Sequence, residues 1–287
     1  MNILSEIYSI VVLYNCKVSE SETLKTLNQV FVYLNVKLNV LIYDNTIEKD
    51  NNVKGSTFNN LEIEYYHNPF NPGVAAAYNL AIEKGIQNKK KWLILLDQDT
   101  TISKSYFKEL ISSTSENILK NDIVCYIPKV VLKTGEVISP SKMKLGGFCQ
   151  PLKNLTGLQK KCITAINSGT VLNLTFLESI GGFTNKFPLD MLDHWYFREI
   201  YSHKKMVYIL NTEIIHDLSI KSFESSVSAK RYRIILDAEK EFYNSYLLNF
   251  AIYKYRLCLR LIKQLFYKDK VYFKLSLKAL IHIKLKE

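Results

Sequence analysis

Apolar runs separated by polar, turn-forming residues divide the first hundred residues into short segments. The run that begins at Trp92 is apolar at consecutive positions without alternation, which is typical of a strand buried on both faces of a sheet. The pattern predicts strands over residues 7–14, 38–43, 61–66 and 92–97. The last strand ends in the carboxylates Asp97 and Asp99.

Between these predicted strands, apolar residues recur every three to four positions, which predicts helices. Leu24, Leu27 and Phe31 lie on one helical face, and Ser19 or Ser21 can cap that helix. Another helix departs at Val74 after a turn rich in Asn and Pro. Strands and helices in this order predict an α/β fold with a mostly parallel sheet, right-handed crossovers and flanking helices.

The second half of the chain gives a weaker pattern. It predicts a helix over residues 103–119, a strand over 123–131, loops and short strands over 135–158, and short strands at 206–210 and 213–216. Asp190 and Asp193 are three residues apart, so on a helix they would share a face. From about residue 222 onward we expect helices only.

Two carboxylates directly after a buried strand suggest ligand chemistry. The carboxyl ends of parallel strands face a cleft, and Mg²⁺ or Mn²⁺ is usually held by one or two carboxylates together with substrate phosphates. The structural alternative is that Asp97 and Asp99 only form the turn, with Thr100 or Ser103 capping the next helix. This motif does not decide between the two by itself.

Composition limits the class of protein. With 287 residues, 47% of them hydrophobic, the chain can bury a full core as one domain with an appended segment. Five scattered cysteines without a C-x-x-C pair predict reduced thiols and a cytoplasmic protein. The N-terminal apolar run is too short to span a bilayer and has no basic segment before it, so we expect no signal peptide.

Several short segments together resemble the inverting glycosyltransferases of family 2, which have the GT-A fold, and within them the bacterial rhamnosyltransferase-like group. The segments follow the family's order over about residues 7–220. They are Val11-Val-Leu-Tyr-Asn15, Asp44-Asn45, residues 71–79, Leu95-Leu-Asp-Gln-Asp-Thr100, Ser168-Gly169, residues 181–183, residues 190–198 and Ile215-His216.

The resemblance implies a nucleotide-sugar donor. Asp44 would accept a hydrogen bond from the base or the ribose, and an Asx turn is the structural alternative. The implied contacts to the donor further include Tyr14, Asn15, Asn45, Asn71, Gly73, Asn79, Asp97, Ser168, Gly169, Trp195 and Arg198. Turn geometry is the alternative explanation for Gly73, and tying down a loop is the alternative role of Asn79. Trp195 would form a wall for a sugar ring.

The resemblance also implies a Mn²⁺ or Mg²⁺ cofactor and a catalytic base. Asp99 would be the direct metal ligand, Asp97 would contact ribose or reach the ion through water, and His216 would be a further ligand. Inversion needs a carboxylate that takes the acceptor's proton. Asp193 is the first candidate and Asp190 the second, because the spacing to Arg198 departs from the family's usual acidic pair. The structural alternative is that both acids cap a helix.

These implications give an expected function and its rivals. We expect transfer of L-rhamnose from dTDP-rhamnose to a glycan or lipid-linked acceptor in cell-surface polysaccharide synthesis. A UDP-hexose donor, galactose or glucose, is the alternative, and a catalytically inactive relative that binds nucleotide is another. A nucleic-acid-binding protein would suit the basic, tyrosine-rich tail but leaves the acids at the strand ends unexplained, so we expect no nucleic-acid partner.

Most of the net charge belongs to the tail. From Lys230 onward there are 14 basic and five acidic residues, a net charge of +9 out of +11 for the chain. We therefore predict a catalytic domain over residues 1–220 and a basic, amphipathic helical extension over 221–287. The extension would lie on an anionic membrane surface at the inner face of the cell membrane. Its apolar positions 243, 246, 247, 250, 253, 257, 261 and 265 would form the apolar face. The alternative is that this helix packs on the catalytic domain and the next one forms a homodimer contact.

Overall fold

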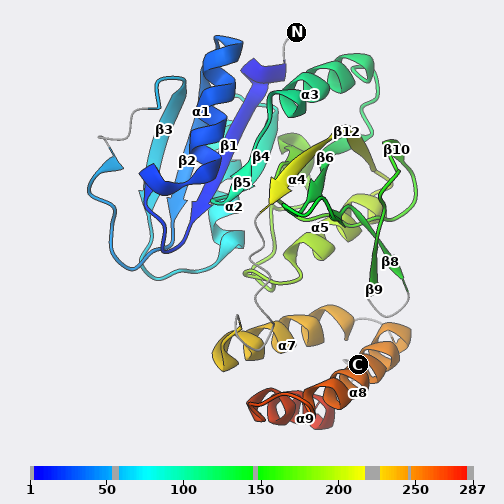
Figure 1. Ribbon diagram of the computed structural model, residues 1–287. Helices are drawn as coiled ribbons and strands as arrows, with labels where there is room; N and C mark the ends of the chain where they lie inside the picture. Colours follow the sequence, from blue (N-terminus) through cyan, green and yellow to red (C-terminus); the bar gives the residue numbers. More distant parts are fainter. Residues whose placement is uncertain (1–2, 54–57, 145–147, 217–226, 245–246, 283–287) are drawn as a thin grey trace. The chain divides into compact units, whose positions relative to one another are not determined.

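The computed structural model describes residues 3–53, 58–144, 148–216, 227–244 and 247–282 (Figure 1). Contacts divide the chain into two compact units. One comprises Met1–Ser141 and Pro151–Asp217, and the other comprises Lys142–Gln150 and Leu218–Glu287. The predicted domain boundary between residues 220 and 221 lies outside the described residues.

One large sheet forms the centre of the first unit. Its main path runs in the order β10-β12-β6-β11-β4-β1-β2-β3, with β5 paired to β12 and β7 to β6. The strands are β1 (Ile7–Leu13), β2 (Leu38–Asp44), β3 (Leu61–His67), β4 (Trp92–Asp97), β5 (Thr100–Thr101), β6 (Ile123–Val131), β7 (Val137–Ser139), β10 (Gly157–Gln159), β11 (Thr170–Asn173) and β12 (Met206–His216). Every residue of β1 is buried, as expected for a central strand.

The sheet is mixed. The pairs β1/β2, β2/β3, β1/β4 and β6/β12 are parallel, and β11 runs antiparallel between β4 and β6. The predicted strands at residues 206–210 and 213–216 are one strand, β12, whose register against β6 shifts between Ile209 and Glu213. That irregularity explains why the sequence pattern breaks there.

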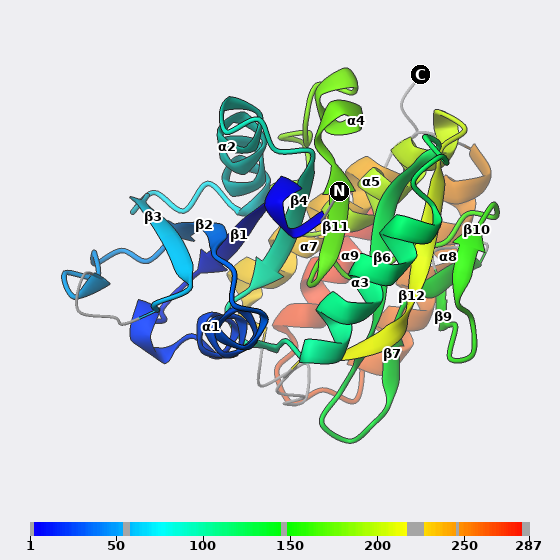
Figure 2. The same ribbon diagram turned by 90° about the horizontal axis from the view of Figure 1, so that it is seen from above.

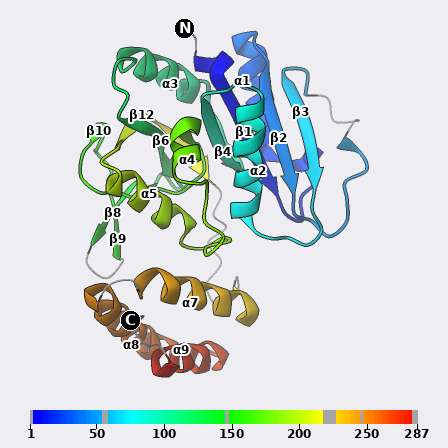
Figure 3. The same cartoon turned by 180° about the vertical axis from the view of Figure 1, so that it is seen from behind.

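Helices cover both faces of this sheet. In Figure 2, α1 (Glu22–Leu34) and α3 (Lys104–Glu116) lie on one face, and α2 (Val74–Gln87), α4 (Leu174–Ser179) and α5 (Leu192–Ser202) lie on the other. Figure 3 shows the second face, with α2 and α4 in contact. Ser21 and Ser103 cap α1 and α3 by accepting hydrogen bonds from Leu24 and Tyr106, as predicted. The short helices η1 (Ile3–Glu6) and η2 (Val18–Glu20) flank β1.

The second unit is mainly helical. The helices α7 (Ala229–Tyr243), α8 (Leu247–Gln264) and α9 (Val271–His282) contact one another, and β8 (Ser141–Lys144) pairs with β9 (Phe148–Pro151). None of the helices in the described part of the chain is long and apolar enough to cross a membrane. The cysteines whose side chains the structure describes, Cys16, Cys125, Cys162 and Cys258, are free thiols.

Candidate active site

The carboxyl ends of β1, β2 and β4 bring the first group of predicted site residues to one edge of the sheet. Leu13 of β1 is in register with Asp44 of β2, and Val12 is in register with Asp97 of β4. Because all three strands are parallel, the segments that follow them leave the sheet at the same edge. The predicted nucleotide and metal residues of these segments therefore emerge side by side.

His216 reaches the same region from a strand far away in the sequence. The short strand β5 pairs antiparallel with the end of β12, which puts His216 opposite Thr100. Nδ1 of His216 lies 3.3 Å from Oδ1 of Asp99 and 3.3 Å from Oγ1 of Thr100. The side chain of Asp99 is 46% exposed and that of His216 only 8% exposed. The Asp99 carboxylate is therefore accessible to a ligand, and the buried His216 contacts it from the protein side.

The turn between Asp97 and Thr100 is held by the start of α1. Thr23 donates its hydroxyl hydrogen bond to the backbone carbonyls of Asp97 and Thr100, and it accepts one from the amide of Thr100 at 2.9 Å. Ser21 donates to the carbonyl of Gln98 at 2.9 Å. These bonds fix the backbone of the turn that carries Asp97 and Asp99.

Ser168 and Gly169 support this turn from β11. Ser168 is fully buried, and its hydroxyl bonds to the hydroxyl of Thr100 and to Asp97. Gly169 has φ of +74°, and a Cβ at this position would overlap Ile214 and Pro128. Both residues therefore have a structural role beneath the acidic turn. Their predicted contact with the donor stays a prediction.

The pKa of Asp97 indicates which charges surround it. Burial raises this pKa above its usual range, the charge of His216 opposes the rise, and the charges of Asp99 and Asp193 add to it. Burial also raises the pKa of Tyr78 well above its usual value, with further contributions from Asp97 and Asp193. Tyr78 is thus within electrostatic reach of both acids, and the structure brings Asp193 into the neighbourhood of the acidic turn.

The structure corrects the expectation that Asp190 and Asp193 share a helical face. Helix α5 begins at Leu192, and Met191 before it is in the left-handed conformation, with φ of +65°. Asp190 therefore lies outside the helix, whereas Asp193 is in its first turn and accepts a hydrogen bond from the amide of His194 at 2.7 Å. A left-handed residue breaks the 3.6-residue periodicity on which the expectation rested.

Trp195 and Arg198 lie further along α5, and both are partly buried. The indole ring of Trp195 lies 6.3 Å from the ring of Phe183, in a tilted arrangement. His194 contacts Thr164 through Nδ1 at 2.8 Å. The predicted roles of Trp195 and Arg198 in holding a sugar stay predictions.

Asp44 lies beside a cleft of about 630 Å³. The cleft is lined by Asn15, Cys16, Lys17, Ser19, Glu20, Asp44, Thr46, Glu48, Lys49, Asp50, Asn51 and Asn52. Asp44 forms the Asx turn that the sequence left open, because Oδ1 accepts from the amide of Thr46 at 2.9 Å. Its Oδ2 accepts from the hydroxyl of Tyr65 at 2.6 Å. A carboxylate oxygen can accept more than one hydrogen bond, so Asp44 keeps the capacity for a further donor.

Tyr14, Asn15 and Asn45, which lie near Asp44, differ in exposure and in hydrogen bonding. Tyr14 is 49% exposed, and its amide donates to Gln98 Oε1 at 2.8 Å, which connects the end of β1 to the acidic turn. Asn15 has φ of +52° and donates its amide to Thr46 Oγ1 at 2.9 Å. Asn45 is buried, and its Oδ1 finds no hydrogen-bond partner among the described residues. Such a buried polar atom is expected to have a partner, which a ligand or water would supply.

The N-terminus of α2 packs against another segment of the chain, at Pro188. Gly73 has φ of +96°, and a Cβ there would overlap the carbonyl of Pro188. The amide of Ala75 donates to that same carbonyl at 3.2 Å. Asn71, with φ of +45°, belongs to the turn before the helix. Turn geometry and close packing therefore explain Gly73 without a phosphate, and the predicted phosphate contacts stay predictions.

Asn79 ties two segments together. Its Nδ2 donates to the carbonyl of Phe183 and its Oδ1 accepts from the amide of Phe183, both at 2.8 Å. These are the loop-tying contacts that the sequence offered as one role of Asn79, and its predicted contact with the donor stays a prediction. Asn79 fixes α2 to the loop that leads towards Asp190 and Asp193.

The side chains around Asp99 can be compared with the ligands that a hard divalent cation prefers. Among the described residues no three His, Cys, Asp or Glu side chains are grouped as a metal site. The side chains that do meet are Asp99 and His216, with Asp97 close enough for its pKa to respond to both. A carboxylate completed by phosphate oxygens and water suits Mn²⁺ or Mg²⁺, and the imidazole of His216 is the softer group beside it.

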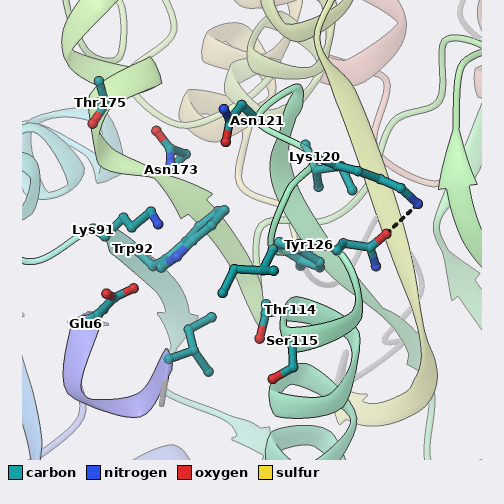
Figure 4. A pocket seen from close by; sticks show the side chains of 14 residues that line it. Glu6, Lys91, Trp92, Thr114, Ser115, Lys120, Asn121, Tyr126, Asn173 and Thr175 are labelled. Atoms are coloured by element: carbon teal, nitrogen blue, oxygen red, sulfur yellow. Dashed lines mark hydrogen bonds between the residues drawn. The ribbon is translucent and has the colours of Figure 1, made fainter. Parts of the chain in front are cut away.

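A separate pocket of about 260 Å³ lies at the other end of β4 (Figure 4). Its lining includes Trp92, the first residue of β4, and Tyr126. Its polar side chains are partly committed to the fold, because Lys120 donates to Asn117 at 2.8 Å and Asn173 caps α4. None of the predicted site residues lines this pocket, and we do not assign the active site to it.

Sequence reasoning missed some residues that organise the site. Tyr65 orients Asp44, and Asn167 bonds to the buried hydroxyl of Tyr78 near Asp97 and Asp193. Tyr65 could have been suspected, since it alternates with exposed positions on the edge strand β3. No local signal distinguishes Asn167 or Tyr78 from ordinary turn and core residues.

Comparison with known proteins agrees with this geometry. Residues 9–169 match the family described as Glycosyl transferase family 2, which is more than half of the chain. The chain therefore belongs to this family. No curated protein sequence matches the chain at a significant level.

Solved structures of S. aureus TarS share the fold. The chain of TarS aligns with a TM-score of 0.55 and 15% identity over 92% of this chain and 44% of TarS. TarS 1-349 in complex with UDP-GlcNAc aligns with a TM-score of 0.58 and 14% identity over 96% of this chain and 81% of that one. The chain thus spans less than half of the length of the longer TarS chain. The mixed, mostly parallel sheet flanked by helices is a GT-A-like α/β fold.

Proposed function

We propose that this chain transfers a sugar from a nucleotide diphosphate donor to a hydroxyl group of an acceptor, with inversion at the anomeric carbon. The observation that carries the proposal is the meeting of Asp97, Asp99 and His216 at one edge of the sheet, with Asp193 close enough to raise the pKa of Asp97. This arrangement combines a phosphate-side group of ligands with a separate carboxylate. The separate carboxylate can act as the base, and a metal ion on the phosphate side can stabilise the leaving diphosphate.

Asp193 is the proposed base. Its carboxylate takes the proton of the acceptor hydroxyl as that oxygen attacks the anomeric carbon from the face opposite the diphosphate. The bond from the anomeric carbon to the diphosphate oxygen then breaks, and the nucleotide diphosphate leaves. Asp190, which lies outside α5, is the second candidate.

A divalent cation completes the proposal. Mn²⁺ or Mg²⁺ held by Asp99 and His216, with Asp97 nearby, would offset the negative charge that develops on the leaving diphosphate. The exposure of Asp99 and the adjacent Nδ1 of His216 support this assignment. The rigid turn between Asp97 and Thr100 holds the ligands in place before the donor binds.

The donor side of the site is the cleft beside Asp44. Its lining offers amide and carboxylate groups, and Asn45 next to it carries a buried oxygen without a partner among the described residues. We propose dTDP-L-rhamnose as the donor and a glycan or a lipid-linked sugar as the acceptor, in cell-surface polysaccharide synthesis. A UDP-sugar is the second candidate, because TarS 1-349 has been solved with UDP and with UDP-GlcNAc.

Thermal-shift measurements test the proposal across donors. The chain is heated with dTDP-rhamnose, UDP-glucose, UDP-galactose, UDP-GlcNAc or ATP, each with Mn²⁺ and with a chelator. A ligand at about 100 times its Kd adds about 2.7 kcal/mol to the free energy of unfolding. We expect one nucleotide sugar to raise the Tm in the presence of Mn²⁺ only. No shift with any nucleotide sugar, or an equal shift with ATP, would contradict the proposal.

A further inference from the structure

Helix α8 exposes a second apolar face that the sequence pattern did not reveal. Tyr255, Leu259 and Ile262 lie on one side of the helix, and Phe266 follows in the turn after the helix ends at Gln264. Their exposed fractions are 59%, 41%, 57% and 85%. We call these four residues the α8 stripe. A contiguous exposed apolar surface of this kind marks an interaction site more often than scattered single residues do.

The apolar face predicted from the sequence is not the exposed one. Tyr253, Leu257 and Leu261, three of the predicted positions, are buried within the helical unit, where α8 contacts α7 and α9. The hydroxyl of Tyr253 reaches Glu239 of α7, and Arg260 donates two hydrogen bonds to the same carboxylate at 2.9 and 2.8 Å. These contacts fix which side of α8 faces α7. The α8 stripe is therefore directed away from the packed face.

Basic side chains border the stripe. At 100° per residue, Lys254 lies on one flank of the stripe, and Arg256 and Lys263 lie on the other. Residues 247–282 contain eight Lys or Arg residues and one acid, Asp269, which is a net charge of +7. An apolar stripe between rows of cations is the pattern of helices that lie in the interface of an anionic bilayer.

A hollow of about 420 Å³ opens beside the stripe. Leu259 of the stripe lines it together with Arg256, Lys263 and the aromatic residues Tyr232 and Tyr267. Guanidinium and ammonium groups are the usual partners of phosphate, and tyrosine is enriched at the level of lipid head groups. The hollow thus offers a place for a phosphate head group next to the apolar surface that its acyl chains would contact.

From these features we infer that the α8 stripe binds the surface of an anionic phospholipid bilayer, with Arg256 and Lys263 contacting lipid phosphates. In a cell this surface is the cytoplasmic leaflet. A second copy of the chain fits less well, because it would bring two surfaces of net charge +7 together. The inference stands apart from the proposed sugar transfer, since it concerns only residues of the helical unit.

Vesicle sedimentation with the full-length chain tests the inference. The vesicles contain either phosphatidylcholine alone or phosphatidylcholine mixed with phosphatidylglycerol, at low and high salt. We expect at least roughly tenfold stronger partitioning into the anionic vesicles at low salt, weakened by high salt. Equal partitioning into neutral and anionic vesicles would overturn the inference.

The Ile262→Ser/Phe266→Ser double variant tests the stripe itself. Loss of two exposed apolar side chains should lower the partition coefficient roughly tenfold or more. Leu119→Ser is the matched control, because Leu119 is 91% exposed and lies in the other unit. Unchanged partitioning of the double variant would overturn the inference. So would a concentration-dependent dimer of the wild type, seen in analytical ultracentrifugation, that the double variant abolishes.

Phe266→Trp keeps the surface apolar and reports on its environment. Its fluorescence emission, after subtraction of the wild-type spectrum, should shift to the blue when anionic vesicles are added. Circular dichroism and Tm values equal to those of the wild type would show that each variant is folded. A folded Phe266→Trp variant whose emission does not respond to anionic vesicles would also overturn the inference.

Discussion

Oδ1 of Asp99 lies 3.3 Å from Nδ1 of His216, although the two residues are 117 positions apart in the sequence. The contact depends on β5, which consists of only two residues and pairs with the last two residues of β12. A shift of that register by one residue would turn His216 to the other side of the strand. The metal-binding proposal therefore rests on a short stretch of strand pairing.

Asp97→Asn should stabilise the metal-free protein at neutral pH. Burial, Asp99 and Asp193 raise the pKa of Asp97, so ionised Asp97 costs the folded state free energy that the unfolded chain does not lose. The cost is absent below the pKa of the unfolded chain, and it grows as the pH rises through the raised pKa of the folded state. Each 1 kcal/mol would raise the Tm by about 2–4 °C.

The measurement compares Tm values of both proteins in a chelating buffer. The difference should be largest at neutral pH and should shrink as the pH approaches the ordinary value for Asp. The exposed Asp237 provides the control, and Asp237→Asn should leave the Tm unchanged. An Asp97→Asn variant that is less stable than the wild type at neutral pH would contradict the assigned electrostatics.

Asp193→Asn should separate donor binding from turnover. The substitution keeps the shape of the side chain and removes the proposed base, so donor affinity should stay within about twofold while kcat falls by roughly 100-fold or more. Asp190→Asn is the matched comparison, and kcat should change little. If Asp190→Asn loses turnover and Asp193→Asn remains active, the two roles are reversed.

Tyr65→Phe should weaken donor binding through Asp44. The tyrosine hydroxyl donates to Asp44 Oδ2 at 2.6 Å and accepts from the amide of Asp50 at 3.2 Å, so it orients both residues of the cleft. A hydrogen bond to a charged group contributes about 1.5–3 kcal/mol to stability. Without it Asp44 is no longer held in one orientation, and we expect the KM for the donor to rise several-fold. Tyr66→Phe, one position along β3, is the control. A fall in kcat with an unchanged KM would show that Asp44 has a different role.

Asn79→Ala should destabilise the protein without a specific effect on the donor. It removes two hydrogen bonds to the backbone of Phe183 and leaves both backbone groups without those partners. We expect a loss of about 2–4 kcal/mol in the free energy of unfolding, measured with urea. Asn88→Ala, at the end of the same helix, should cost less because its hydrogen bond to Lys84 is exposed. An unchanged stability together with a higher donor KM would mean that Asn79 binds the ligand.

Local patterns predicted most strands of the catalytic unit, because buried parallel strands are apolar without interruption. The strand over residues 92–97 and the helix starting at Val74 agree with β4 and α2. The antiparallel insertion of β11 could not be predicted in this way. The sequence of a four-residue strand does not indicate whether it pairs parallel or antiparallel with its neighbours. Only the pairing of β11 with β4 and β6 defines its direction and its place in the sheet.

The candidate site was predictable only where its residues end a strand. Asp44 and Asp97 follow apolar runs directly, so their position at the sheet edge could be predicted from periodicity. Asp190 was misplaced because the left-handed Met191 leaves no sequence signal of its own. The periodicity of α8 could not show which side of the helix is exposed, because α8 is apolar on two sides and only its contacts with α7 and α9 decide which one is buried.

Calorimetric titration of the donor into wild type, Asp99→Ala and His216→Ala tests the central claim most directly. His203→Ala, on the exposed end of α5, serves as the control. The proposed site predicts that the wild type binds a nucleotide sugar with Mn²⁺ and much more weakly with a chelator. It further predicts that Asp99→Ala loses this metal dependence, and that His216→Ala weakens metal-dependent binding by roughly tenfold or more. Equal donor affinity of Asp99→Ala and wild type in the presence of Mn²⁺ would contradict the account.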